Sequence, residues 1–426
     1  MIKFLLAIYF VFPKINIISF PGFITGIRVD DIAALGILIC ILVSKKIPRT
    51  SIDNLVLIYL ILITVSFIGN LNSVSLWNVL SYLRIIEYLV ISISLIHFLN
   101  FKEIVLGIKI YLVLNLIYCI LQWGLGFPGF ASIGLLYDLS RLYGLTGGAW
   151  ELGAIAAISA IYISIYDYSY NDSKPSRIFL IICAALIIFS ASRSQIPVLP
   201  IIFLAILGFS LDKSYKNIFR LNQLPVFLGL LIIGYYGFNY LFFSYQNLTQ
   251  SEARAFVEGG GIVARSVEVI SIENIKIFSD LFNDPYISSS RDSITGGSNW
   301  SVDYGSHPEA DDSFLIRAYK WVNVLNVLIQ NPYNVIFGFG PGALGDALDG
   351  GFLRSFAEYG IFFAFYIYFI LKRFLKFPNI LMILSFFIPT MLLIDIHLSS
   401  KVQPLILSLA IFSNFFNPEK KHESGH

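Results

Sequence analysis

The feature that most constrains this chain is its succession of long apolar runs, each bounded by charged or turn-forming residues. A helix needs about 20 apolar residues, within a range of roughly 17–25, to cross the hydrocarbon core of a bilayer. The pattern predicts about twelve such spans. They lie near residues 2–20, 30–44, 53–69, 77–99, 103–124, 149–166, 178–192, 194–211, 224–243, 351–371, 379–395 and 402–416. We therefore expect an all-α polytopic membrane protein.

The composition argues against a water-soluble protein. Only 13% of the 426 residues are charged and 57% are hydrophobic, whereas soluble domains carry about 25% charged residues. A net charge of +2 without a long basic run gives no indication of nucleic-acid binding. Cys40, Cys119 and Cys183 lie in apolar runs and are interpreted as small hydrophobic residues. We expect neither a metal nor a cofactor.

The distribution of Lys and Arg predicts the orientation, because cytoplasmic loops of membrane proteins are enriched in these residues. With the amino terminus in the cytoplasm, the inner loops and tail hold Lys45, Lys46, Arg49, Lys102, Lys174, Arg177, Lys213, Lys216, Arg220, Lys372, Arg373, Lys376, Lys420 and Lys421. The short outer loops hold only Arg28, Arg141, Arg193 and Lys401. Both termini are thus expected in the cytoplasm.

This topology divides the chain into three parts. Residues 1–243 hold nine predicted spans with a medium outer loop at 125–148, residues 244–350 form a large outer loop, and residues 351–426 hold three spans and a cytoplasmic tail. The large loop is acidic, with six Lys/Arg against thirteen Asp/Glu. Its length indicates that it has a structure of its own.

Charged residues inside apolar runs need an explanation, because each costs about 2.5–3.5 kcal/mol at the centre of a bilayer. Arg84 and Glu87 are three residues apart and share a helix face, so we interpret them as a structural ion pair. Arg193 lies in the break Ser190–Gln195 between two predicted helices. There it either points into a cavity or marks the membrane boundary.

A glycine-rich segment from Arg141 to Glu151 runs directly into a predicted helix. Gly144, Gly147 and Gly148 allow tight turns, and free amides at a helix start beside an arginine favour anion binding. Glu151 stands in the first turn, where the helix dipole alone also favours a carboxylate.

The entry into the tenth predicted span carries Asp349, Arg354 and Glu358. Two carboxylates and an arginine at an outward-facing cavity are the groups that glycosyl transfer from a phosphate leaving group requires. Two structural alternatives stay open. Arg354 and Glu358 have the spacing of an ordinary helix pair, and Asp349 has the position of an N-cap.

The large loop adds Arg254, Arg265, Arg291 and Arg317. A planar guanidinium suits a phosphate group because it can donate two parallel hydrogen bonds. The acidic residues of the same loop are equally available as partners for these arginines.

In the order of these segments the chain resembles the O-antigen polymerases (Wzy type) and their relatives, the O-antigen ligases. The likeness is carried by Arg141–Glu151 before a helix, Ser192-Arg193 between helices, Asp312 and Arg317 ahead of Phe337–Gly340, and Asp349–Gly360 entering a span. Together with the twelve-span topology it covers nearly the whole chain.

The resemblance implies a metal-independent, inverting glycosyltransferase of the bacterial inner membrane. Its donor and acceptor would be undecaprenyl-diphosphate-linked glycans, with a chain-length regulator protein and membrane lipids as partners. An acceptor hydroxyl attacks the anomeric carbon while arginines neutralise the departing diphosphate and a carboxylate accepts the proton. The predicted catalytic residues are Asp349, Glu358 and Arg193. The residues predicted to bind the diphosphate are Arg141, Arg265, Arg317, Arg354 and Glu151.

Three other functions remain as alternatives. An O-antigen ligase usually carries a His where this chain has Asp349, which favours the polymerase. Another transferase of lipid-linked sugars is the second alternative. A lipid-linked oligosaccharide flippase would suit twelve spans with intramembrane charges, but alternating access has no evident use for an outer loop as long as 244–350.

Overall fold

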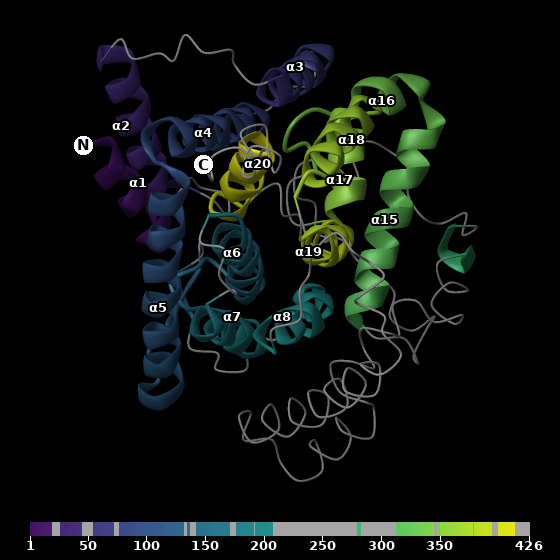
Figure 1. The fold of residues 1–426 in the computed structure, drawn as a ribbon. Coiled ribbons are helices and arrows are strands. Elements are labelled where there is room, and N and C mark those ends of the chain that lie inside the picture. Colours follow the sequence, from purple (N-terminus) through teal and green to yellow (C-terminus); the bar gives the residue numbers. More distant parts are fainter. Residues whose placement is uncertain are drawn as a thin grey trace.

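The structure is a computed structural model, and it describes residues 1–18, 26–44, 54–71, 76–131, 134–136, 142–170, 176–190, 192–207, 279–282, 312–344, 348, 350–377, 379–393 and 399–413. Within these ranges the chain is built almost entirely of helices (Figure 1). The predicted span at 224–243 and most of the predicted large loop lie outside the described residues.

The helices of the first half coincide with the apolar runs predicted there. They are α1 (Ile2–Val11), α2 (Val29–Ser44), α3 (Asn54–Gly69), α4 (Leu76–Phe98), α5 (Phe101–Leu125), α6 (Ala149–Tyr170), α7 (Arg177–Ser190), the 3-10 helix η2 (Arg193–Val198) and α8 (Leu199–Ile206). Helix α1 is shorter than its predicted span. Phe12 is extended, because the residue before a proline, here Pro13, is disfavoured in the helical region.

The second half holds α15 (Asp312–Gln330), α16 (Pro332–Phe337), α17 (Gly351–Tyr359), α18 (Phe362–Phe374), α19 (Ile380–Leu393) and α20 (Val402–Phe412). The span predicted at 351–371 is therefore two helices. Gly360 separates them with a φ of +68°, a backbone conformation that residues other than glycine rarely adopt. A Cβ at this position would lie 2.0 Å from the carbonyl oxygen of Ile336, so the break also brings α16 close.

Three of the described helices are long and apolar enough to cross a membrane: Asn78–Phe98, Phe101–Leu125 and Ala149–Asp167. Six shorter apolar helices accompany them, among them α1, α3 and α19. This part of the chain fits an all-α membrane protein, as predicted from the sequence.

Two short antiparallel hairpins, which the sequence did not predict, lie between helices. Strand β1 (Asn16–Ile18) pairs with β2 (Ile27–Arg28), and β3 (Gly129–Ala131) pairs with β4 (Gly134–Leu136). The first hairpin places Arg28 immediately before the start of α2.

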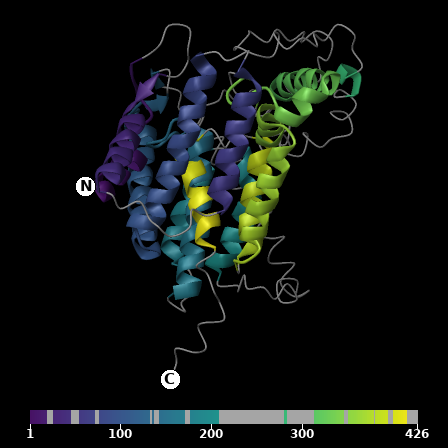
Figure 2. The same cartoon turned by 90° about the horizontal axis from the view of Figure 1, so that it is seen from above.

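Helix α6 lies at the centre of the bundle and contacts α5, α7, α19 and α20 (Figure 1). In the most apolar stretch of α6, 89% of the residues are buried, compared with 39% in the corresponding stretches of α4 and α5. Helices α4 and α5 therefore present much of their surface outward. Most helices run along the bundle axis, whereas α15 lies across one end (green in Figure 2). Helix α15 packs against α16 and α17 at that end.

Candidate functional site

The structure describes half of the predicted site residues with their side chains. Glu151, Arg317, Arg354 and Glu358 are among them, and only the backbone of Arg193 is described. The other three, Arg141, Arg265 and Asp349, lie outside the described residues.

Three of the predicted segments converge on one helix. Helix α6, which begins just before Glu151, η2, which begins at Arg193, and α17, which carries Arg354 and Glu358, all pack against α19 (Figure 1). The contact to η2 includes a hydrogen bond from Gln195 Nε2 to Thr390 Oγ1 at 3.0 Å.

The first turns of α6 also pack against the non-helical residues between α7 and η2. Gly153 lets this break approach so closely that an added Cβ would lie 2.7 Å from Ser190 Oγ and 2.8 Å from the Cβ of Ser192. The segment before α6 is tied to the same place, because the backbone amide of Leu142 donates to the carbonyl of Phe189 at 3.1 Å. The segment before α6 and the break after α7, which are far apart in the sequence, thus meet at the start of α6.

Glu151 is fully buried at this point and has three partners. Lys14 Nζ lies 2.5 Å from its Oε1, and the two side chains are 9% and 0% exposed. Ser399 Oγ donates to the same oxygen, and the backbone amide of Gly147 donates to Oε2 at 2.9 Å. The carboxylate therefore joins α6 to the segment after α1 and to the segment before α20.

Lys401, two residues after Ser399, is the second buried cation beside Glu151. Its Nζ donates to the carbonyls of Phe12 and Leu145, both at 2.9 Å, and to the Tyr111 hydroxyl at 3.2 Å. Burial lowers the pKa of Lys401 to about 8, and the nearby Glu151 carboxylate opposes this shift.

Several amides of the glycine-rich turn before α6 have acceptors within the protein. Gln122 Oε1 accepts from Gly144 at 2.9 Å, and Asn115 Oδ1 accepts from Leu145 at 2.9 Å. Glu151 Oε2 accepts a hydrogen bond from the amide of Gly147. The anion position that the sequence predicted at this turn is occupied, in the described residues, by the protein's own carboxylate and amide side chains.

A second charged group, which the sequence did not predict, adjoins the first. Arg28 Nε lies 3.1 Å from Asp30 Oδ1, and Arg28 Nη2 lies 3.4 Å from Asp31 Oδ1. Arg84 Nη2 lies 3.7 Å from Asp31 Oδ2 and donates to the carbonyl of Gly26 at 2.6 Å. The spacing of Arg84 and Glu87 predicted that these two residues pair, whereas Arg84 reaches Asp31 on α2.

One oxygen from each of Asp30, Asp31 and Glu87 lies within 4.8 Å of the others, a spacing that a metal ion requires. Two guanidinium groups already lie against these carboxylates and supply the positive charge. We therefore interpret this group as an ion-pair network. Ser400 Oγ donates to Asp30 Oδ2 at 2.9 Å, so the residues 399–401 contact both charged groups.

The third buried charge pair lies within α17. Arg354 Nε donates to Glu358 Oε1 at 2.9 Å, and the two side chains are 1% and 0% exposed. The backbone of the same turn is held from outside: Phe339 donates to the carbonyl of Ala357 at 2.7 Å, and Ser66 Oγ donates to that of Glu358 at 2.5 Å. The pair thus belongs to a helix fixed by α3 and by the glycine turn after α16.

Arg317 lies on α15, which crosses the end of the bundle. Trp321, one turn further along the same face, donates from Nε1 to the carbonyl of Leu348 at 3.1 Å. A Cβ at Gly350 would lie 2.9 Å from that Nε1. The helix of Arg317 therefore packs on the two described residues that flank the predicted catalytic position 349.

Sequence reasoning missed Lys14 and Ser399 as partners of Glu151, and it missed Lys401 as the second cation beside this carboxylate. These contacts join segments more than a hundred residues apart, and neither motif nor spacing indicates them. Comparison of the chain with protein-family models, curated proteins and solved structures gave no significant match.

Proposed function

We propose that the chain is an integral-membrane glycosyltransferase that joins undecaprenyl-diphosphate-linked repeat units into an O-antigen or related surface polysaccharide. One observation carries the proposal. The segments that hold Glu151, Arg193, Arg354 and Glu358 pack around the single helix α19. The charged side chains of Glu151, Arg354 and Glu358 are buried there, although burying a charge is costly.

The residues divide into two roles in this proposal. Arginines stabilise the diphosphate as the bond to the anomeric carbon breaks, which is electrostatic stabilisation of a developing charge. Arg354 lies in α17, and Arg317 lies on the helix that packs against the start of α17. A carboxylate accepts the proton of the attacking hydroxyl. Asp349 and Glu358 are the candidates, and Arg354 Nε lies 2.9 Å from Glu358 Oε1 in its buried position.

Glu151 takes a different role from the one that its sequence position suggested. A carboxylate that accepts from Lys14, Ser399 and Gly147 is engaged within the protein, and its negative charge repels a diphosphate. In the proposal it positions the start of α6 beside η2, so that Arg193 is held at the site. The site faces the periplasm, with both termini in the cytoplasm of a bacterial inner-membrane protein.

The test uses purified protein with a synthetic lipid-diphosphate-linked repeat unit and no added metal, followed on a glycan gel. We expect a ladder that persists in EDTA. The variants Arg193→Ala, Asp349→Ala and Glu358→Gln should abolish it. Lys372→Ala, which removes an exposed cation at the far end of α18, is the matched control and should leave the ladder intact.

A second candidate is a flippase for lipid-linked oligosaccharides, favoured by the charged groups around residues 399–401. Four buried or partly buried cations face four carboxylates across several helices, the kind of network that can exchange partners between two states. The residues are Lys14, Arg28, Arg84, Lys401, Asp30, Asp31, Glu87 and Glu151. Deletion of the gene separates the candidates. Loss of a polymerase leaves a single repeat on the surface, whereas loss of a flippase leaves lipid-linked units on the cytoplasmic face.

A further inference from the structure

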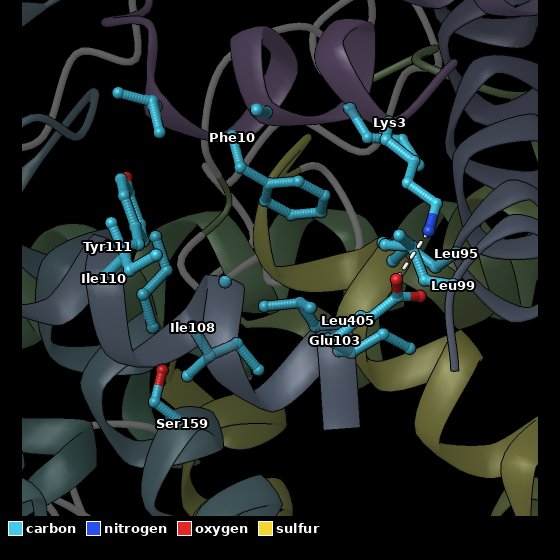
Figure 3. A pocket seen from close by; sticks show the side chains of 16 residues that line it. Lys3, Phe10, Leu95, Leu99, Glu103, Ile108, Ile110, Tyr111, Ser159 and Leu405 are labelled. Carbon is cyan, nitrogen blue, oxygen red and sulfur yellow. Dashed lines mark hydrogen bonds and ion pairs between the residues drawn. The ribbon is translucent and has the colours of Figure 1, made fainter. Parts of the chain in front are cut away.

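A cavity of about 230 Å³ lies between α1 and the bundle (Figure 3). Tyr111, which accepts a hydrogen bond from Lys401, is among its lining residues. Helix α1 covers it from one side with Leu6, Phe10 and Val11, and α5 lines the other with Ile104 and Ile108. Its lining is almost entirely apolar. An apolar cavity of about 150 Å³ suffices to hold benzene, so this cavity has room for part of a hydrocarbon chain.

The cavity borders the surface that α5 presents to the surroundings, because the exposed Ile110 is among its lining residues. Gly107 lines it, and an added Cβ there would meet nothing within 4 Å. Leu106 and Ile110, next to Gly107 in sequence and on the following turn, are exposed apolar side chains. Because α5 is long and apolar enough to cross a membrane, the surroundings at this face are lipid tails. If the cavity were empty, the side chains that line it would lack dispersion contacts, and a lipid chain in the cavity would supply them.

A paired cation and anion stand at one end of this cavity. Lys3 and Glu103 belong to the first turns of α1 and α5, and their charged atoms lie 2.5 Å apart (Figure 3). Both are exposed, at 60% and 37% of their side chains. A zwitterionic headgroup complements such a pair, since its phosphate meets the ammonium and its amine meets the carboxylate. A primary ammonium also donates hydrogen bonds to Glu103, which a choline group cannot.

We propose that the cavity between α1 and α5 holds an acyl chain of phosphatidylethanolamine, whose headgroup binds Lys3 and Glu103. The site is separate from the proposed glycosyl-transfer site. The lipid fills the space that α1 leaves against α5 and α6 and thereby fastens α1 to the bundle.

The test is mass spectrometry of the intact protein in mild detergent with added palmitoyl-oleoyl phosphatidylethanolamine. Gly107→Phe places a ring in the cavity. Gly124→Phe is its matched control, because it makes the same change on the same helix where an added Cβ also meets nothing within 4 Å. We expect about tenfold weaker lipid binding for Gly107→Phe than for the control, which corresponds to about 1.4 kcal/mol. Lys3→Gln with Glu103→Gln should remove the preference for ethanolamine over choline headgroups.

Equal lipid binding by the two α5 variants would overturn the proposal, as would equal binding of phosphatidylcholine by the wild-type protein. If polyprenyl monophosphate displaces the phospholipid, the occupant of the cavity is a carrier lipid. That outcome would also overturn the proposal. A second measurement needs no variant. Phosphatidylethanolamine with a photoreactive acyl chain should label the cavity-lining residues of α1 and α5 in wild-type protein, and labelling confined to other helices would contradict the proposal.

Discussion

The charged group around residues 399–401 and the Arg354–Glu358 pair are both buried, but they are built in different ways. The first joins α6, the segment after α1 and the segment before α20 through contacts such as Lys14–Glu151 and Ser399–Glu151. The second lies within one helical turn, at the i, i+4 spacing. Removing a partner should therefore loosen contacts between helices in the first case, whereas in the second case it breaks a bond inside α17.

This difference also bears on function. A carboxylate that accepts from three separate loop segments is committed to the fold, whereas the Arg354–Glu358 pair is formed inside α17. We accordingly assign chemistry to the Arg354–Glu358 region and architecture to Glu151. The predictions below test that assignment.

The largest effect is expected for Glu151→Gln, because it leaves Lys14 and Lys401 buried without their carboxylate. Removing one partner of a buried ion pair costs about 3–5 kcal/mol. Thermal unfolding of the detergent-solubilised protein measures this loss. The matched control is Glu103→Gln, which removes the carboxylate of another Lys–Glu pair with the same 2.5 Å separation but an exposed position, and should change the melting temperature little. Equal losses in the two variants would refute the structural role of Glu151.

Gly360→Ala should have the next largest effect, because it tests the turn that ends the helix of Arg354 and Glu358. Gly126→Ala is the control: its φ of +67° matches the +68° of Gly360, but an added Cβ there meets nothing within 4 Å. The control should cost about 1–2 kcal/mol for the left-handed conformation alone. Gly360→Ala adds a Cβ placed 2.0 Å from a backbone oxygen and should cost more. Similar melting temperatures for both variants would show that α16 can shift away from position 360 at little energetic cost, which would contradict the prediction.

The sequence predicted the local features and missed the distant ones. Apolar runs located most of the described helices, although they did not indicate α16 and joined α17 and α18 into one span. The i, i+4 spacing indicated the Arg354–Glu358 pair, because such a contact follows from helix geometry. The partners of Glu151 lie 137 and 248 residues away, and no periodicity relates them. Arg84 has a near neighbour in Glu87, yet it reaches Asp31 on another helix. Long-range packing decided these contacts, and a single sequence does not display it.

Arg354→Lys sharpens the comparison by keeping the charge of the pair while losing the guanidinium geometry. We expect a loss of about 2–3 kcal/mol of stability, since a charged hydrogen bond in a buried position is removed. Glycan synthesis should fall more steeply, by about 100-fold, if the guanidinium stabilises the leaving diphosphate. Unfolding temperature and ladder formation are measured on the same preparation. A fall in activity that only follows the fraction of folded protein would assign the pair to structure alone.

The smallest effects come from two buried serines that differ in their partners. Ser399 donates to Glu151, so Ser399→Ala should cost about 1.5 kcal/mol, at the low end for a bond to a charged group because Lys14 and Gly147 remain. The hydroxyl of Ser159, which lines the cavity beside α1, has no hydrogen-bond partner among the described residues. Ser159→Ala removes a buried polar group without breaking a bond and should leave the melting temperature unchanged or raise it slightly. A lower melting temperature for Ser159→Ala than for Ser399→Ala would mean that the cavity holds a polar partner for Ser159, and would contradict an occupant that is purely hydrocarbon at that depth.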